Sequence, residues 1–230
     1  VKTWQLNMEA ANAENPAAIA LLELSTFLAP AEIPECILTA GAEQLGFGFG
    51  DYLQGDILED APNDERDADI SLALRELLAL LSQYSLVRWA GDPATYSVHR
   101  LVLAVVRDQI TAEKAADWLA QATAAVAEAY PGQQDFEHWP LCRQLLPHWL
   151  RILEQAEAIA YRSVALGLGC NEAGFFLQSQ GRYEAAEPLY RQALEIRETE
   201  LGDRHPDTAS SLLKIAALYH THERSEPAQP

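Results

Sequence analysis

Two groups of residues have the types and spacing that chemistry would need. His138 and Cys142 are four positions apart, so a helix would place both on one face, as two ligands of a metal ion are placed. No C-x-x-C pair completes such a site, and a Cys142 nucleophile would need a base, for which His138 and His148 are the nearby imidazoles. The glycine-rich segment 46–51 lacks the lysine of a phosphate-binding loop. We therefore predict no catalytic residue, no metal ion and no cofactor bound by this chain.

The charge of the chain limits its partners. Thirty-four acidic residues face 16 basic ones, which gives a formal net charge of −18. Such a body repels phosphate backbones and anionic lipid heads, and no apolar run reaches the roughly 18 residues of a membrane span. Three widely spaced cysteines fit a reducing compartment. We predict a cytoplasmic protein that binds neither nucleic acid nor membrane, and Val1 at the first position suggests an excised or processed fragment.

The elements that would position these residues follow from periodicity and caps. Asn15 and Pro16 suit the cap and first position of a helix, and Ser71 suits another cap. The predicted elements are helices at 17–28, 33–41, 72–83 and 101–110, and strands at 85–90 and 95–98. That order is typical of a winged-helix domain, which we place at residues 1–110 with an exposed acidic insertion at 44–70.

The second half of the sequence shows only helical signals. We predict helices at 113–130, 138–157, 161–180, 183–201 and 206–222. Pro147 should kink or split the second of these, because its ring clashes with the preceding turn. The fold class is thus mainly α: a winged-helix domain with a short β-hairpin, a helical hairpin linker at 111–160, and a tetratricopeptide-like stack at 161–230.

A repeat supports this stack. Small and large residues alternate with tetratricopeptide spacing at Gly174, Leu177, Gly181, Tyr183, Ala186, Tyr190 and Ala193. A shift of 42 residues places Gly174 on Ala216 and Leu177 on Tyr219. Small residues let antiparallel helices approach, and the aromatic rings fill the space between them. We predict one full repeat and part of a second, with these nine residues packing it.

Longer sequence words resemble known families. GRYEAAEPLY at 181–190 and LGDRHPD at 201–207 are similar to kinesin-light-chain-type tetratricopeptide repeats. WQL at 4–6, YSLV at 84–87 and YSVHRL at 96–101, together with WPLC at 139–142, resemble the segment that follows the NB-ARC ATPase in bacterial STAND-type signalling proteins. In that family a winged helix and tandem repeats follow the ATPase.

The resemblance implies roles for three residues. His99 and Arg100 stand where the family has its Met-His-Asp signature, so His99 would sense ADP phosphates held by an upstream ATPase domain, and Arg100 replaces the usual Asp. ADP or ATP would then reach this chain only through that domain. Asn171 matches an asparagine that clamps peptide backbone in the repeat groove. The alternatives are that His99 caps its helix under the hairpin and that Asn171 caps a helix or faces solvent.

These observations favour a non-catalytic regulatory and protein-interaction module of a STAND-type ATPase, coupling nucleotide state to a repeat sensor array. Its partners would be proteins or the rest of its own chain. A stand-alone tetratricopeptide adaptor is the alternative, and a DNA-binding winged helix is a further one, although helix 72–83 has no basic stripe. The truncated repeat exposes apolar residues of 206–222, so we expect this end to fray, to be covered by a neighbouring chain, or to self-associate.

Overall fold

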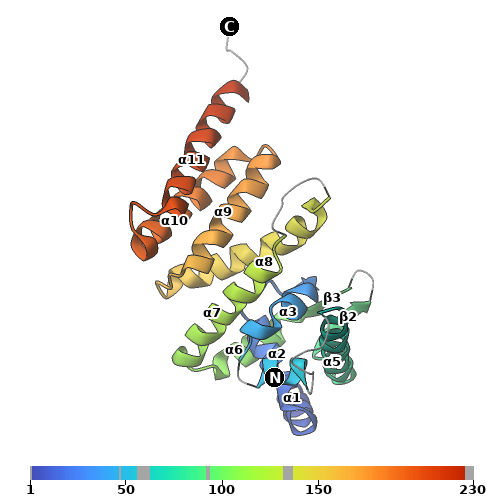
Figure 1. Cartoon of the computed structure of the whole chain (residues 1–230). Helices are drawn as coiled ribbons and strands as arrows, with labels where there is room; N and C mark the ends of the chain where they lie inside the picture. Colours follow the sequence, from blue (N-terminus) through green and yellow to red (C-terminus); the bar gives the residue numbers. More distant parts are fainter. Residues whose placement is uncertain (1, 47, 56–62, 92–93, 132–136, 226–230) are drawn as a thin grey trace.

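A computed structural model describes residues 2–46, 48–55, 63–91, 94–131 and 137–225 (Figure 1). The protein is mainly helical, with a small three-stranded sheet in its first half and a stack of antiparallel helices in its second half. The first half lies at one end of the molecule, and the stack extends from it to the C-terminal helix (Figure 1). The predicted fold class is confirmed.

The first half contains short helices around the sheet. Its elements are α1 (Lys2–Glu14), α2 (Pro16–Ser25), β1 (Ile33–Pro34), α3 (Cys36–Ala40), the 3-10 helix η1 (Ala42–Gln44), α4 (Phe49–Gln54), α5 (Asn63–Gln83), β2 (Val87–Gly91), β3 (Ala94–Val98) and α6 (Arg100–Gln109). Asn15 caps α2 as predicted, since its side-chain oxygen accepts a hydrogen bond from the Ala17 N–H at 3.0 Å. The predicted hairpin is confirmed as β2 and β3. Helix α1 was not predicted.

The sheet has one strand more than predicted. Its order is β1-β3-β2, antiparallel throughout, with Ile33 opposite Tyr96 and Val87 opposite Val98. The prediction that a helix starts at residue 33 is therefore wrong, because Ile33–Pro34 is an edge strand and the helix begins at Cys36. An edge strand tolerates Pro34, since its missing N–H would face away from the ladder.

Helix α5 begins earlier than predicted and contains part of the acidic insertion. It starts at Asn63, so Ser71 lies inside the helix and does not cap it. Ile70, Leu74 and Leu77 are buried, whereas the acidic side chains of 65–69 are exposed on the other side. The charges therefore stay solvated while one apolar stripe packs. The prediction that the whole insertion is exposed is also wrong for Leu45, Phe49 and Leu53, which are buried. Residues 47 and 56–62 of the insertion lie outside the described residues.

The second half is a stack of long helices. They are α7 (Ala112–Glu128), α8 (Trp139–Ala158), α9 (Val164–Ser179), α10 (Tyr183–Leu201) and α11 (Pro206–Ser225). The bounds of α10 agree with the prediction, and no strand follows Val98 among the described residues. Pro147 lies inside α8, which continues through it, so the helix is not split there and the kink stays a prediction.

Helix α7 packs closely against the first half. The Glu23 carboxylate on α2 accepts hydrogen bonds from Lys114 Nζ at 2.9 Å and Trp118 Nε1 at 3.1 Å. At Gly41 an added Cβ would lie 2.5 Å from the Ala125 Cβ, so only glycine allows this approach. The segment predicted as a linker therefore contributes to the core of the first half.

Candidate functional site

His99 forms the cap of α6. Its Nδ1 accepts a hydrogen bond from the Leu101 N–H at 3.2 Å, and its ring meets the Trp4 ring edge-on at a centroid distance of 5.2 Å. Because Nδ1 accepts, the neutral imidazole carries its proton on Nε2. The side chain is exposed. The alternative that His99 caps its helix is confirmed, and the predicted action of His99 on a nucleotide stays a prediction.

Arg100 lies at a cleft between α6 and α8. The cleft has a volume of about 380 Å³. It is lined by Thr26, Leu28 and Pro30 of the segment that follows α2, by Arg100, Leu103, Ala104 and Arg107 of α6, and by Arg151 of α8. The α6 residues follow the spacing i, i+3, i+4 and i+7, which places them on one face of the helix. Of these three arginines, only Arg100 was predicted from the sequence to be functional.

The arginines of this cleft differ in their surroundings. The Arg107 guanidinium lies over the Phe27 ring, 4.2 Å from its centroid, and is half-buried. Burial, and then the like charge of Arg151, lower the pKa of Arg107. Arg151 pairs with Glu154 on its own helix at 2.6 Å. The like charge of Arg151 is thus close enough to disfavour the charged form of Arg107.

Helix α8 joins the two halves of the molecule. On one face, His148 Nδ1 accepts a hydrogen bond from the Ala29 N–H at 3.2 Å, and Gln155 donates to the Thr26 carbonyl at 3.4 Å. Burial lowers the pKa of His148 to about 4. On another face, Trp149 is fully buried against α9, where an added Cβ at Gly169 would lie 2.3 Å from its ring.

Asn171 of α9 is buried where this helix meets α10 and α11. With its amide oxygen facing Arg197, that oxygen accepts from Nη1 and Nη2 of the guanidinium, the latter at 3.0 Å, and from Ser211 Oγ at 3.1 Å. Arg197 also donates to the Asp207 carbonyl at 2.9 Å. Asn171 is 1 % exposed, so a peptide would reach it only if α11 moved. The groove role of Asn171 stays a prediction.

The predicted repeat residues lie mostly between α9 and α10. Leu177, Ala186, Tyr190 and Ala193 are buried, and an added Cβ at Gly174 would lie 3.0 Å from the Tyr190 ring. Gly181 has φ +73°, which suits glycine, and Tyr183 is half-buried.

The partial second repeat is more open. Ala216 is exposed, while the Tyr219 hydroxyl accepts from Arg191 at 2.8 Å and donates to Glu187 at 2.5 Å. Helix α11 continues to Ser225, past the predicted end at 222. Leu218 is buried and Ile215 half-buried, but Leu212 and Leu213 are exposed.

The remaining candidates for chemistry are dispersed. His138 and Cys142 lie at the start of α8, and in the part of the chain that the structure describes no group of three His, Cys, Asp or Glu could hold a metal ion. Within the same residues, no helix is long and apolar enough to cross a bilayer. The acidic side chains of α5 at 65, 67 and 69 are exposed. Arg75 of the same helix pairs with Glu35 at 3.7 Å.

Comparison with known proteins matches two segments of the chain to family models. Residues 162–230 match the tetratricopeptide repeat family, and residues 9–115 match a family described as a domain of unknown function (DUF7779). A protein of Hyaloscypha variabilis described as a nucleotide-binding leucine-rich repeat (NLR)-like protein is 23 % identical over 217 residues. That alignment covers 92 % of this chain and 19 % of the relative, so the chain spans about a fifth of the relative's length. No solved structure matches.

These matches support a repeat-based protein-interaction module. They agree with the predicted repeats and with the resemblance to nucleotide-binding signalling proteins, while the bacterial assignment stays a prediction. The sequence did not predict that His148 and Arg151 of α8 would both lie against the first half. Their spacing of three places them on one helix face, but only the fold shows what that face meets.

Proposed function

We propose that this chain is a non-catalytic regulatory module of a STAND-type signal-transduction ATPase and couples the nucleotide state of that ATPase to a tetratricopeptide array. The repeat match and the NLR-like relative support the class. The order of helices and the β2–β3 hairpin in the first half supports a winged-helix domain. In this proposal ADP or ATP is bound by the ATPase domain and not by residues 1–230.

The observation that carries the proposal is the position of α8. His148 on this helix bonds to Ala29 of the first half, and the neighbouring Trp149 packs on Gly169 of the repeat stack. Protein interiors are close-packed, so a displacement of the first half must either move α8 or open a void beside it. A change of shape at the first half is thereby transmitted to the repeats.

The sensing group in this proposal is His99. Its Nε2–H can donate to a phosphate oxygen, because Nδ1 is occupied by the Leu101 N–H. The same residue starts α6, whose other end contributes Arg107 to the cleft beside α8. A contact between His99 and a nucleotide would therefore act on a helix that borders the joint.

The test compares the isolated chain with the longer polypeptide that contains its ATPase domain. Calorimetry should show no ADP binding by residues 1–230. In the longer polypeptide His99→Ala should release ADP faster than wild type, whereas His220→Ala, at an exposed position of α11, should not. Tight ADP binding by the isolated chain, or unchanged release in the His99 variant, would contradict the proposal.

A stand-alone tetratricopeptide adaptor is the second candidate. Leu212 and Leu213 on α11 are 50 % and 70 % exposed, and such apolar residues favour a contact with another protein. Sedimentation of residues 1–230 tests whether this partner is a second copy. If changing both leucines to Gln alters neither the solubility nor the sedimentation of residues 1–230, this result would argue against a contact at this face.

A further inference from the structure

We propose that the cleft between α6 and α8 binds an acidic helical segment of a partner protein, whose carboxylates pair with the arginines at the two ends of the cleft. The proposal concerns a ligand other than the nucleotide, although Arg100 belongs both to this cleft and to the predicted nucleotide signature. It holds for residues 1–230 alone and does not depend on an upstream ATPase.

The charge of the cleft is opposite to that of the molecule. In a chain of net charge −18, Arg100, Arg107 and Arg151 converge on one concavity. The other residues that line it are apolar or carry a hydroxyl group, as in Leu28, Leu103 and Thr26. The carboxylate bound to Arg151 is that of Glu154, on the same helix. An anionic partner is therefore attracted here while the acidic surface elsewhere repels it.

The arginines are available and partly pre-positioned. Arg100 is exposed and makes no ion pair with any described residue. The Arg107 guanidinium is held over the Phe27 ring at 4.2 Å and contacts Thr26 Oγ1 at 3.5 Å. A guanidinium held in this way loses little freedom when it binds a carboxylate, which is the ligand geometry that arginine favours.

The spacing of the charges indicates a peptide and not a single phosphate. Arg100 and Arg107 are seven residues apart on one face of α6, which corresponds to about 10 Å along the helix. Leu103 and Ala104 lie between them, so the surface is positive, apolar and positive again. A phosphate group is too small to contact both ends. A helix with Glu at positions i and i+7 and Leu at i+3 and i+4 repeats the same spacing with opposite charge.

Such a partner would lie across the joint between the two halves. Arg100 and Arg107 belong to the first half, and Arg151 belongs to α8, which carries the repeat stack. A segment that contacts both sides would bind best when the halves are arranged as in this structure. The site would therefore make the arrangement of the halves sensitive to an acidic partner.

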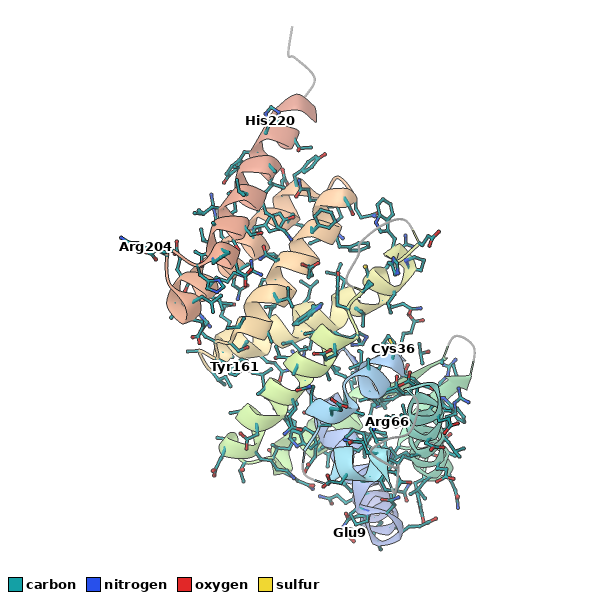
Figure 2. All side chains as sticks on the ribbon, viewed as in Figure 1. Glu9, Cys36, Arg66, Tyr161, Arg204 and His220 are labelled. Atoms are coloured by element: carbon teal, nitrogen blue, oxygen red, sulfur yellow. The ribbon has the colours of Figure 1, made fainter. Side chains whose placement is uncertain are left out.

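The test uses residues 1–230 and a labelled 18-residue helical peptide with Glu at i and i+7 and Leu at i+3 and i+4, measured by fluorescence anisotropy. Replacing both Glu by Gln should weaken binding by about tenfold or more, and Arg100→Gln or Arg151→Gln should each weaken it by roughly three- to tenfold. Arg204→Gln is the matched control, because Arg204 is an exposed arginine at the far edge of the stack (Figure 2). Circular dichroism establishes that each variant is folded.

Three results would overturn the proposal. The first is no binding of the Glu peptide, and the second is equal affinity for the Glu and Gln peptides. The third is an equal loss in the Arg204 and Arg100 variants, which would reveal a general effect of charge. Inorganic pyrophosphate serves as the small-anion probe: if it binds with dependence on Arg100 and Arg151 while the peptide does not bind, the cleft is a small-anion site and the peptide proposal is wrong.

Discussion

Acidification should weaken this fold through His148. The imidazole is 1 % exposed, its Nδ1 accepts the Ala29 N–H, and burial lowers its pKa from 6.5 to about 4. Between about pH 4 and 6.5, His148 therefore binds a proton in the unfolded chain but stays neutral in the folded chain. The stability that depends on neutral His148 is fully present above pH 6.5, and it is lost as the pH falls from 6.5 toward about 4.

The size of the effect follows from these two pKa values. Proton linkage gives a loss of about 2 kcal/mol at roughly pH 5 relative to neutral pH, with a limiting slope of about 1.4 kcal/mol per pH unit. Urea unfolding at about pH 7.5, 6 and 5 measures this loss. The chain carries 34 acidic residues, whose own titration changes the stability too, so the wild type alone does not isolate His148.

His148→Asn supplies the comparison. The Asn oxygen can accept from the Ala29 N–H but does not titrate in this range. We expect the variant to be less stable at neutral pH because of poorer packing, but to lose about 2 kcal/mol less than wild type on acidification. His220→Asn, at the exposed position labelled in Figure 2, should keep the wild-type pH dependence. Parallel pH profiles for wild type and His148→Asn would refute the reasoning.

Two further predictions concern the repeat stack. Gly169→Ala should lower the free energy of unfolding by about 1–3 kcal/mol in urea, because its Cβ would lie 2.3 Å from the buried Trp149 ring. Gly91→Ala is the control: no described atom lies within 4 Å of the added Cβ, so the free energy of unfolding should change by less than about 1 kcal/mol. Equal effects would show that Trp149 yields freely. Asn171→Leu should lower the free energy of unfolding by about 3 kcal/mol, because it leaves the buried Arg197 guanidinium without the Asn171 oxygen. Arg197→Met should lower it by less, because that change leaves only neutral groups buried. The reverse order in the same assay would count against this account.

The features that local sequence predicted have local causes. Asn15 and Pro16 begin α2 because a side-chain cap and a missing N–H both satisfy the first turn of a helix. Helix α10 ends at Leu201 because Gly202 follows with φ +87°. The spacing of Gly174 and Tyr190 identified the repeat, since the ring fills the space that the glycine leaves.

The features that were missed depend on distant partners. Ile33 becomes a strand because it pairs with Tyr96, 63 positions later in the chain, and nothing near residue 33 specifies that partner. The start of α5 was placed too late because its acidic residues suggested an exposed loop, although one face of a helix can be fully solvated. The resemblance places Asn171 in a groove, and no residue near it in the sequence indicates its contact with Arg197.

The pH prediction, the proposed transmission through α8 and the proposed acidic partner all involve residues 148–151 of this helix. His148 and Arg151 of α8 lie on one helix face, where His148 bonds to the segment that follows α2 and Arg151 lines the arginine cleft. Trp149, whose side chain points about 100° away from that of His148, packs against α9. If the acidic partner binds best when His148 is neutral and bonded to Ala29, protonation and partner binding must oppose each other. Linkage is reciprocal: protonation of His148 would lower the affinity for the peptide by the same factor by which bound peptide lowers the affinity of His148 for a proton. His148→Asn should remove that coupling, while Arg151→Gln should weaken the binding itself and leave the coupling in place. This difference separates a joint that transmits a change of shape from a surface that only attracts charge.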